Sequence, residues 1–207
     1  MRQSALGSDN HNILPVFSEM KGRSGKTGAI ALVPAEGVNI WVVDIVKIAL
    51  QGAFCEDVSV IALPEGEWPR AMLEEKGQVR ASGLIKQLEP LRLAFDRVLG
   101  VVSTGLSHPG VNHVFGLTEP ETRVSVMSLC HLGRRGEALI KMARRASKTA
   151  IHELGHSYGL RHCGDHKCVM FFSFNLSDTD YKESRFCKKC GEELSLLKSG
   201  AYDRKEV

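Results

Sequence analysis

The sequence has few aromatic residues, little net charge and no long apolar run. Aromatic residues make up 6% of the 207 residues, which argues against a surface on which nucleic-acid bases stack. The formal net charge is only +3, whereas a nucleic-acid-binding domain usually carries a dense basic field. No stretch approaches the roughly 20 apolar residues of a membrane-spanning helix, and residues 1–17 contain no apolar run suited to a secretory signal. We therefore expect a cytoplasmic protein that binds neither nucleic acid nor membranes.

Cysteine is the residue type whose distribution is most informative. The six cysteines are Cys55, Cys130, Cys163, Cys168, Cys187 and Cys190. The last four are clustered, and four of the eight histidines lie within or just before this cluster. In an intracellular chain, clustered cysteine and histidine indicate metal binding rather than disulfides. Cys55 and Cys130 lie outside the cluster, and we expect them to be buried apolar thiols.

Apolar patterns predict alternating strands and helices in the first half of the chain. We expect strands over residues 29–33, 58–63 and 97–103, and helices that begin after Asn39 and over residues 74–94. This order predicts an α/β (α+β) fold with a mixed, mostly parallel twisted sheet and packed helices. Residues 104–110 read as a loop. Strands over 113–117 and 123–129 have a short connection, which favours an antiparallel pair at a sheet edge.

A third helix is predicted over residues 136–160, and it carries a row of basic side chains. This basic stripe consists of Lys141, Arg144, Arg145 and Lys148. The interpretation we favour is a solvated helix face; the alternative is a stripe that extends toward a cleft and favours acidic peptides. After Gly159 the periodicity ends in an irregular, cysteine-rich tail, which we expect to be frayed from Lys198 onward.

We predict one domain overall, with three parts. Residues 1–27 form a flexible arm, 28–160 an N-terminal subdomain with the third helix, and 161–207 a small C-terminal subdomain. The arm contains a segment, residues 22–27, that resembles a phosphate-binding loop. Such a loop should follow a strand and open a helix, whereas this segment precedes a strand, so we do not predict nucleotide binding there.

The motif that carries chemistry is His-Glu-Leu-Gly-His over residues 152–156. On a helix, residues four apart lie on one face with Cβ atoms ~6 Å apart, so His152 and His156 can meet one zinc ion at ~2.0–2.1 Å. Glu153 is offset from both histidines and can serve as general base toward a zinc-bound water.

The motif continues beyond the helix with Gly159 and His162. A third ligand at this distance requires a sharp turn, and a glycine can adopt the positive φ angle that ends a helix. His162 would then complete a site of three histidines with one open position, which is typical of catalytic rather than structural zinc.

The full string, HExxHxxGxxHC-x4-C-x-M followed by CxxC, resembles the archaemetzincin family of metzincin zinc metallopeptidases. The resemblance implies that His152, His156 and His162 bind the catalytic zinc and that Glu153 is the general base. It also implies that Gly159 reverses the chain and that Met170 is the Met-turn methionine beneath the metal. Cys163, Cys168, Cys187 and Cys190 match the ligands of a second, structural zinc.

Thiolate chemistry supports the second zinc independently, because four cysteines in two close pairs form a closed tetrahedral site. We thus predict a metzincin-like zinc peptidase with two zinc ions per chain and a small zinc-bound C-terminal lobe. It is expected to be a monomer that acts on a peptide or protein, extended along the predicted edge strand. Two alternatives remain: a zinc-ribbon-like interaction module, and an inactive peptidase that binds peptides without cleaving them.

Overall fold

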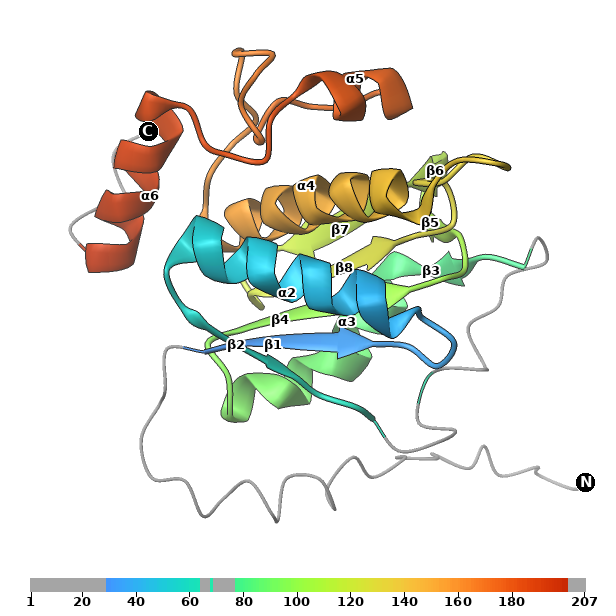
Figure 1. Cartoon of the computed structure of the whole chain (residues 1–207). Helices are drawn as coiled ribbons and strands as arrows, with labels where there is room; N and C mark the ends of the chain where they lie inside the picture. Colours follow the sequence, from blue (N-terminus) through green and yellow to red (C-terminus); the bar gives the residue numbers. More distant parts are fainter. Residues whose placement is uncertain (1–28, 64–67, 69–76, 201–207) are drawn as a thin grey trace, which may run out of the picture.

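The computed structural model describes residues 29–63, 68 and 77–200 (Figure 1). The whole predicted arm, residues 1–27, lies outside these residues, and so does its segment 22–27. Within the described part, no helix combines the length and the apolar character needed to cross a bilayer.

The centre of the fold is a five-stranded sheet with the strand order β2-β1-β4-β8-β7. The strands are β1 (Ala29–Pro34), β2 (Asp57–Val60), β4 (Arg97–Val102), β7 (Gly116–Glu119) and β8 (Val124–Ser128). All neighbouring strands are parallel except β7, which ends the order and runs antiparallel to β8. The predicted mixed, mostly parallel sheet is therefore confirmed.

Helices cover both faces of the sheet and create two apolar cores (Figure 1). Helices α2 (Ile40–Phe54) and α4 (Leu139–Tyr158) pack on one face, and α3 (Ala81–Leu88) with the short 3-10 helix η2 (Glu89–Leu93) packs on the other. The side chain of Asn39 accepts a hydrogen bond from the Trp41 backbone N–H at 3.0 Å, and so caps α2 as predicted.

Two regions differ from the sequence-based expectation: residues 79–80, which form a strand instead of part of the expected helix over 74–94, and the region between β4 and β8. A second, three-stranded sheet contains β3 (Val79–Arg80), β5 (Leu106–His108) and β6 (Val111–Val114). Its hairpin turns at Pro109 and Gly110, where Gly110 has φ 81°. A proline followed by a positive-φ glycine suits a tight turn between strands, so the expected loop is largely a hairpin. The expected strand over 113–117 is divided between β6 and β7.

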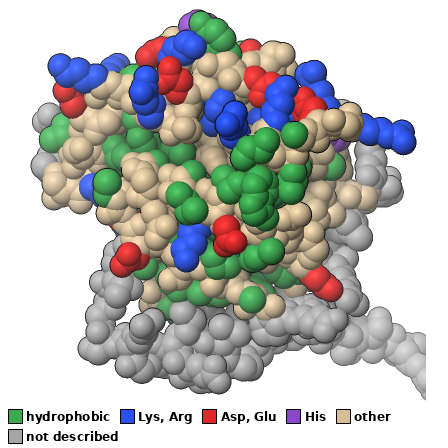
Figure 2. Space-filling model, in the orientation of Figure 1, with side chains coloured by type: hydrophobic (Ala, Val, Ile, Leu, Met, Phe, Trp, Pro, Cys, Tyr) green, Lys and Arg blue, Asp and Glu red, His purple; other side chains and the backbone are tan. Residues whose placement is uncertain are grey.

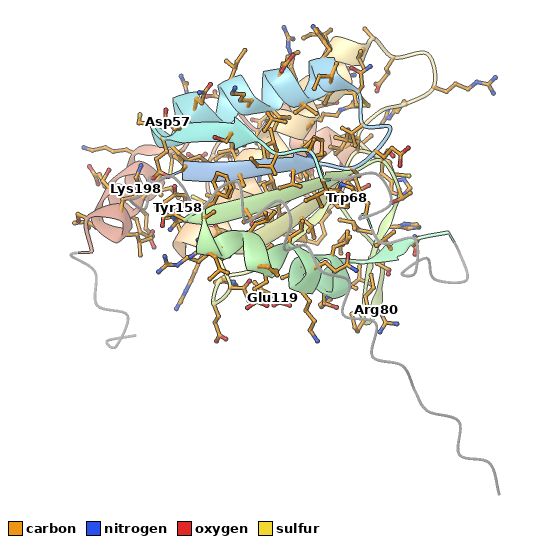
Figure 3. The ribbon with its side chains drawn as sticks, turned by 90° about the horizontal axis from the view of Figure 1, so that it is seen from below. Asp57, Trp68, Arg80, Glu119, Tyr158 and Lys198 are labelled. Carbon is orange, nitrogen blue, oxygen red and sulfur yellow. The ribbon has the colours of Figure 1, made fainter. Side chains whose placement is uncertain are left out.

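The cysteine-rich tail contains two helices that its irregular pattern did not predict, α5 (Leu176–Tyr181) and α6 (Lys188–Ser199). Asn175 and Asp178 form a reciprocal capping box at the start of α5. Helix α6 extends past Lys198, whose Nζ lies 2.8 Å from the Glu56 carboxylate. Figure 3 shows Lys198 beside Tyr158, at the end of the molecule where α6 meets α4. Fraying from Lys198 onward was therefore a wrong expectation for residues 198 and 199.

The basic stripe of α4 is not a simple solvated face. The Arg145 side chain is only 1% exposed and is paired with Glu137 and Asp180, while Lys148 Nζ donates to the carbonyls of Thr179 and Asp180. Basic and acidic side chains gather together along the upper edge of the molecule, over α4 and α5 (Figure 2). The stripe thus anchors the C-terminal segment, and only part of it faces water.

Cys55 and Cys130 are also not buried as expected, because both are exposed. Cys55 follows the last residue of α2 in a left-handed conformation, with φ 52°. Such a position at a helix end lies at the surface, which explains why an apolar environment is absent.

Candidate active site and cysteine cluster

The last turn of α4 and the glycine that follows it set the direction of the chain at the site. Gly159 has φ 107° and ψ 5°. The Gly159 N–H donates to the carbonyls of Gly155 and His156, and the Leu160 N–H donates to the Gly155 carbonyl at 3.0 Å. This is the hydrogen-bond pattern of a glycine-terminated helix, in which a left-handed residue reverses the chain. The reversal brings His162 back toward α4.

The three histidines converge through their Nε2 atoms. His156 Nε2 lies 3.1 Å from His152 Nε2 and 3.2 Å from His162 Nε2. The opposite ring nitrogens of two of them meet backbone carbonyls: His152 Nδ1 lies 2.9 Å from the Val169 oxygen, and His156 Nδ1 lies 2.8 Å from the Leu160 oxygen. Because a carbonyl can only accept, each of these Nδ1 atoms carries the proton, and each Nε2 lone pair is free to bind a metal.

Burial keeps these imidazoles in the neutral form that binds metals. Desolvation lowers the pKa of His152 well below its usual value, and it lowers the pKa of His156 and His162 as well. His162 is the exposed member of the group, and its ring packs against Phe172 with centroids 4.9 Å apart. The three histidines are therefore shielded from solvent on the α4 side and accessible on the side of His162.

Glu153 is buried between α4 and the sheet, with 7% of the residue exposed. Burial raises the pKa of its carboxyl from 4.5 to about 7, although a hydrogen bond from Thr118 and the charge of Lys182 act in the opposite direction. A base with a pKa near the working pH is effective in proton transfer. A divalent cation on the adjacent histidines would lower this pKa, because it stabilises the carboxylate.

Met170 packs directly against the helix that carries the histidines. A Cβ atom added at Gly155 would lie 2.5 Å from Met170 Sδ, so only glycine leaves room for this contact. The Met170 carbonyl accepts a hydrogen bond from the Cys163 N–H at 2.9 Å. Met170 is fully buried and joins the turn after His162 to the underside of α4.

The four clustered cysteines form a second group. Their Sγ atoms, from Cys163, Cys168, Cys187 and Cys190, all lie within 4.8 Å of one another, and none forms a disulfide. Burial raises the pKa of the Cys168 and Cys190 thiols. Four thiolates this close would repel one another unless a cation lay between them, which favours a metal at the centre.

The spacing of both groups fits zinc. Two nitrogens bound to one tetrahedral zinc at ~2.0–2.1 Å lie about 3.3 Å apart, close to the observed 3.1 and 3.2 Å. Two sulfurs bound at ~2.3 Å lie about 3.8 Å apart, and Cys163 Sγ lies 3.8 Å from Cys187 Sγ. Within the described residues, these are the two groups of side chains that could hold a metal ion.

No sequence motif indicates three further residues of the site. Lys182 is 3% exposed, donates to the Phe171 carbonyl at 3.1 Å, and has its pKa lowered by burial to about 8. Gly116 and Thr118 of β7 contact Glu153 directly. A lysine after a short helix, and a glycine and threonine near a predicted strand end, are ordinary in sequence. Their importance depends on contacts with residues far away along the chain.

Three convergent imidazoles beside a buried carboxylate are the arrangement of a metal-dependent hydrolase. The sequence comparison identifies the class: residues 63–196 match the profile of peptidase family M54. The chain therefore belongs to peptidase family M54, and it is a metallopeptidase.

The relatives of this chain are archaemetzincins, as the motif suggested. The archaemetzincin of Pyrococcus abyssi is 34% identical in an alignment of length 186, which covers 84% of this chain and 98% of that protein. A crystal structure of archaemetzincin from Methanopyrus kandleri superimposes with a TM-score of 0.71 at 32% identity, covering 86% of this chain and 98% of that one. A zinc-dependent peptidase from Methanocorpusculum labreanum gives a TM-score of 0.72 at 26% identity, covering 80% and 99%.

Proposed function

We propose that this chain hydrolyses peptide bonds at a catalytic zinc held by His152, His156 and His162, with Glu153 as general base. The observation that carries the proposal is the convergence of three neutral Nε2 atoms beside a buried carboxylate. The names of the relatives add support, since one is described as a zinc-dependent peptidase.

The histidines would hold the metal, and the other residues would move protons and hold the substrate. A zinc ion at this site would supply Lewis acidity, which lowers the pKa of a bound water toward neutrality and polarises a carbonyl group. Glu153 accepts the proton of the attacking water as the C–O bond forms. It then delivers that proton to the nitrogen of the departing amine as the C–N bond breaks. One carboxylate thus serves as base and then as acid.

The substrate would lie extended beside β7, the strand that ends the sheet order. An exposed strand edge can pair with a peptide through main-chain hydrogen bonds. Strand β7 also lies next to α4 (Figure 1), so a peptide on this edge would run close to Glu153. Such main-chain pairing does not select the side chains of the peptide.

We further propose that Cys163, Cys168, Cys187 and Cys190 hold a second zinc with a structural role. Four thiolates close the coordination shell, which leaves no position for a substrate. Cys163 directly follows His162, so the cysteine cluster would fix the segment that carries the third histidine. The segment from residue 161 onward would then act as a small lobe.

The deciding experiment combines zinc counting with hydrolysis of a mixed peptide library. We expect two zinc ions per chain and cleavage that falls about a hundred- to ten-thousand-fold in Glu153→Gln, the range typical of general acid–base catalysis. Glu192→Gln is the matched control, because Glu192 is exposed on α6.

Other outcomes would contradict the proposal in distinct ways. One zinc per chain, with no effect of the histidines on its binding, would support a zinc-ribbon-like module. Two zinc ions with no cleavage that depends on Glu153 would indicate a protein that binds peptides without cutting them.

A further inference from the structure

Strand β7 forms one wall of the space that holds Glu153. It pairs with β8 in a register that sets Gly116 opposite Met127 and Thr118 opposite Ser125. Because side chains alternate along a strand, residues 116 and 118 lie on the same face. That face meets α4, since both residues contact Glu153.

The Thr118 hydroxyl lies among three oxygen atoms. Its Oγ1 is 2.8 Å from Glu153 Oε2, 2.9 Å from the Glu153 carbonyl oxygen and 3.0 Å from Ser125 Oγ. Ser125 Oγ is itself 3.3 Å from the Glu153 carbonyl oxygen. When Glu153 is ionised, as it must be to act as a base, the region thus holds two hydroxyl protons and two oxygens of Glu153 that only accept.

The proton arrangement that satisfies these groups is simple. Ser125 can donate to the Glu153 carbonyl oxygen or to Thr118, but it does not reach the carboxylate in the contacts described. Thr118 is the hydroxyl within reach of the carboxylate, and hydrogen bonds to a charged acceptor are the stronger kind. The Thr118 hydroxyl therefore donates its hydrogen bond to Glu153 Oε2.

Gly116 restricts the same carboxylate from another direction. A Cβ atom at this position would lie 2.6 Å from Glu153 Oε1 and equally close to its carboxyl carbon. The space between the β7 backbone and the carboxylate is therefore filled, and Glu153 cannot swing toward the strand. The Thr118 hydroxyl binds the Glu153 carboxylate, and the close approach of the Gly116 backbone limits its movement. Together they hold the carboxylate in one orientation.

We propose that Thr118 is a positioning residue that fixes the carboxylate of Glu153 by binding Oε2, leaving Oε1 to accept the proton. This inference rests on the proposed function for its catalytic consequence, whereas the contact itself stands on the geometry. Strand β7, which would align the substrate, then also aligns Glu153. The positions of substrate and base would both depend on this one strand.

The test compares Thr118→Val with Thr118→Ser. Valine keeps the shape but removes the donor, and serine restores the donor. A lost hydrogen bond to a charged group corresponds to a fall in kcat of about ten- to a hundredfold. We expect this fall in Thr118→Val, with KM and the content of both zinc ions unchanged, and recovery to within about threefold in Thr118→Ser.

Two further variants sharpen the comparison. Thr122→Val makes the same chemical change on the turn after β7, where the hydroxyl donates to the Glu119 carbonyl and accepts from the Val124 N–H; we expect full activity. Gly116→Ala should displace the Glu153 side chain and lower kcat while both zinc ions stay bound.

A second readout does not depend on turnover. Infrared difference spectra against Glu153→Gln isolate the carboxylate stretch of Glu153, which should move in Thr118→Val and return in Thr118→Ser. An unchanged stretch in Thr118→Val would overturn the proposal, as would a loss of kcat that serine does not restore or that accompanies zinc loss. A stretch that moves as expected in a protein without Glu153-dependent cleavage would uphold the contact and refute the proposed function.

Discussion

At the scale of single residues, the orientation of two histidines depends on the segment that carries the third. The Leu160 carbonyl meets His156 Nδ1, and the Val169 carbonyl meets His152 Nδ1. These two carbonyls lie on either side of the stretch with His162 and Cys163. Partners of this kind fix the tautomer and the ring angle of a metal-binding histidine. A change in the turn after α4 should therefore affect all three rings.

Cys163→Ser should reveal this dependence. Removal of one thiolate weakens the second zinc, and the freed turn should then weaken the catalytic zinc by about tenfold or more, the usual effect of disturbing the partners of metal ligands. Zinc affinity at each site, measured by competition with a chelator, checks the prediction. Cys55→Ser is the control, because Cys55 is exposed and outside the cluster. Unchanged affinity at the histidines in Cys163→Ser would show that the sites are independent.

The residues of the site differ in how far the sequence can reveal them. The three histidines and Glu153 are close along the chain, and their spacing follows from helix geometry and one turn, so the sequence predicts that they converge. Thr118 reaches Glu153 across 35 positions, and no local pattern encodes that contact. It arises only once β7 and α4 are packed together.

At the scale of elements, α4 carries the histidines on one side and anchors the C-terminal segment on another. The Arg145 guanidinium donates to Asp180 through Nε and Nη2, both at 2.7 Å, and to the Leu132 carbonyl at 2.8 Å. It also donates to Glu137 at 2.6 Å. One buried side chain thus ties α5 and the loop before α4 to the same helix.

Arg145→Met should lower the free energy of unfolding by about 2 to 3 kcal/mol, because it removes the buried donor that two carboxylates and a carbonyl share. Arg144→Met is the matched control, since Arg144 is the exposed neighbour. Urea unfolding followed by circular dichroism measures the difference. Equal stability of the two variants would mean that the network contributes nothing.

The same network predicts a dependence of stability on pH. The hydrogen bonds from Arg145 lower the pKa of Glu137 from 4.5 to about 2, and they also lower the pKa of Asp180. Groups with a lowered pKa stabilise the fold above their unfolded pKa, and this contribution disappears as the pH falls from about 5 toward 2. The stability of Arg145→Met should therefore decline less steeply over this range than that of the unaltered protein.

The sequence predicts those helices and strands that are long enough to show a repeating apolar pattern. Strands β1 and β4 and helices α2 and α4 follow clear apolar patterns, and the Asn39 cap marks the start of α2. Helix α5 has six residues, too few for a helical period to appear, although its Asn-Leu-Ser-Asp start is a capping signal. The β5–β6 hairpin has no clear signal in the sequence, because its strands have only three and four residues, too few for an alternating pattern to appear.

At the scale of the whole molecule, the C-terminal segment has little apolar material of its own. Its fully buried apolar residues are few, and they join the core already formed by α2, α4 and the sheet. Small segments with so little core usually depend on a metal for their folding free energy. The zinc at the cysteines would thus determine whether this part is folded.

Removal of zinc by a strong chelator should therefore unfold the C-terminal segment and leave the sheet intact. Amide hydrogen exchange should accelerate in α5 and α6, while protection in β1, β4 and β8 stays high. Addition of zinc should restore protection, whereas magnesium, which prefers oxygen ligands, should not. Unchanged protection of α6 after both zinc ions are gone would contradict this prediction.

One feature of β7 has a consequence for how broadly the protein selects its peptides. Gly116 and Thr118 face α4, while Leu117 packs into the core on the other side of the sheet. With these side chains committed inward, the strand can offer a bound peptide little besides its own main chain. Main-chain pairing depends on the direction and the extended conformation of a peptide, but not on its side chains. Tolerance of many sequences would then be inherent in this edge, and discrimination among them would have to come from other residues around the site.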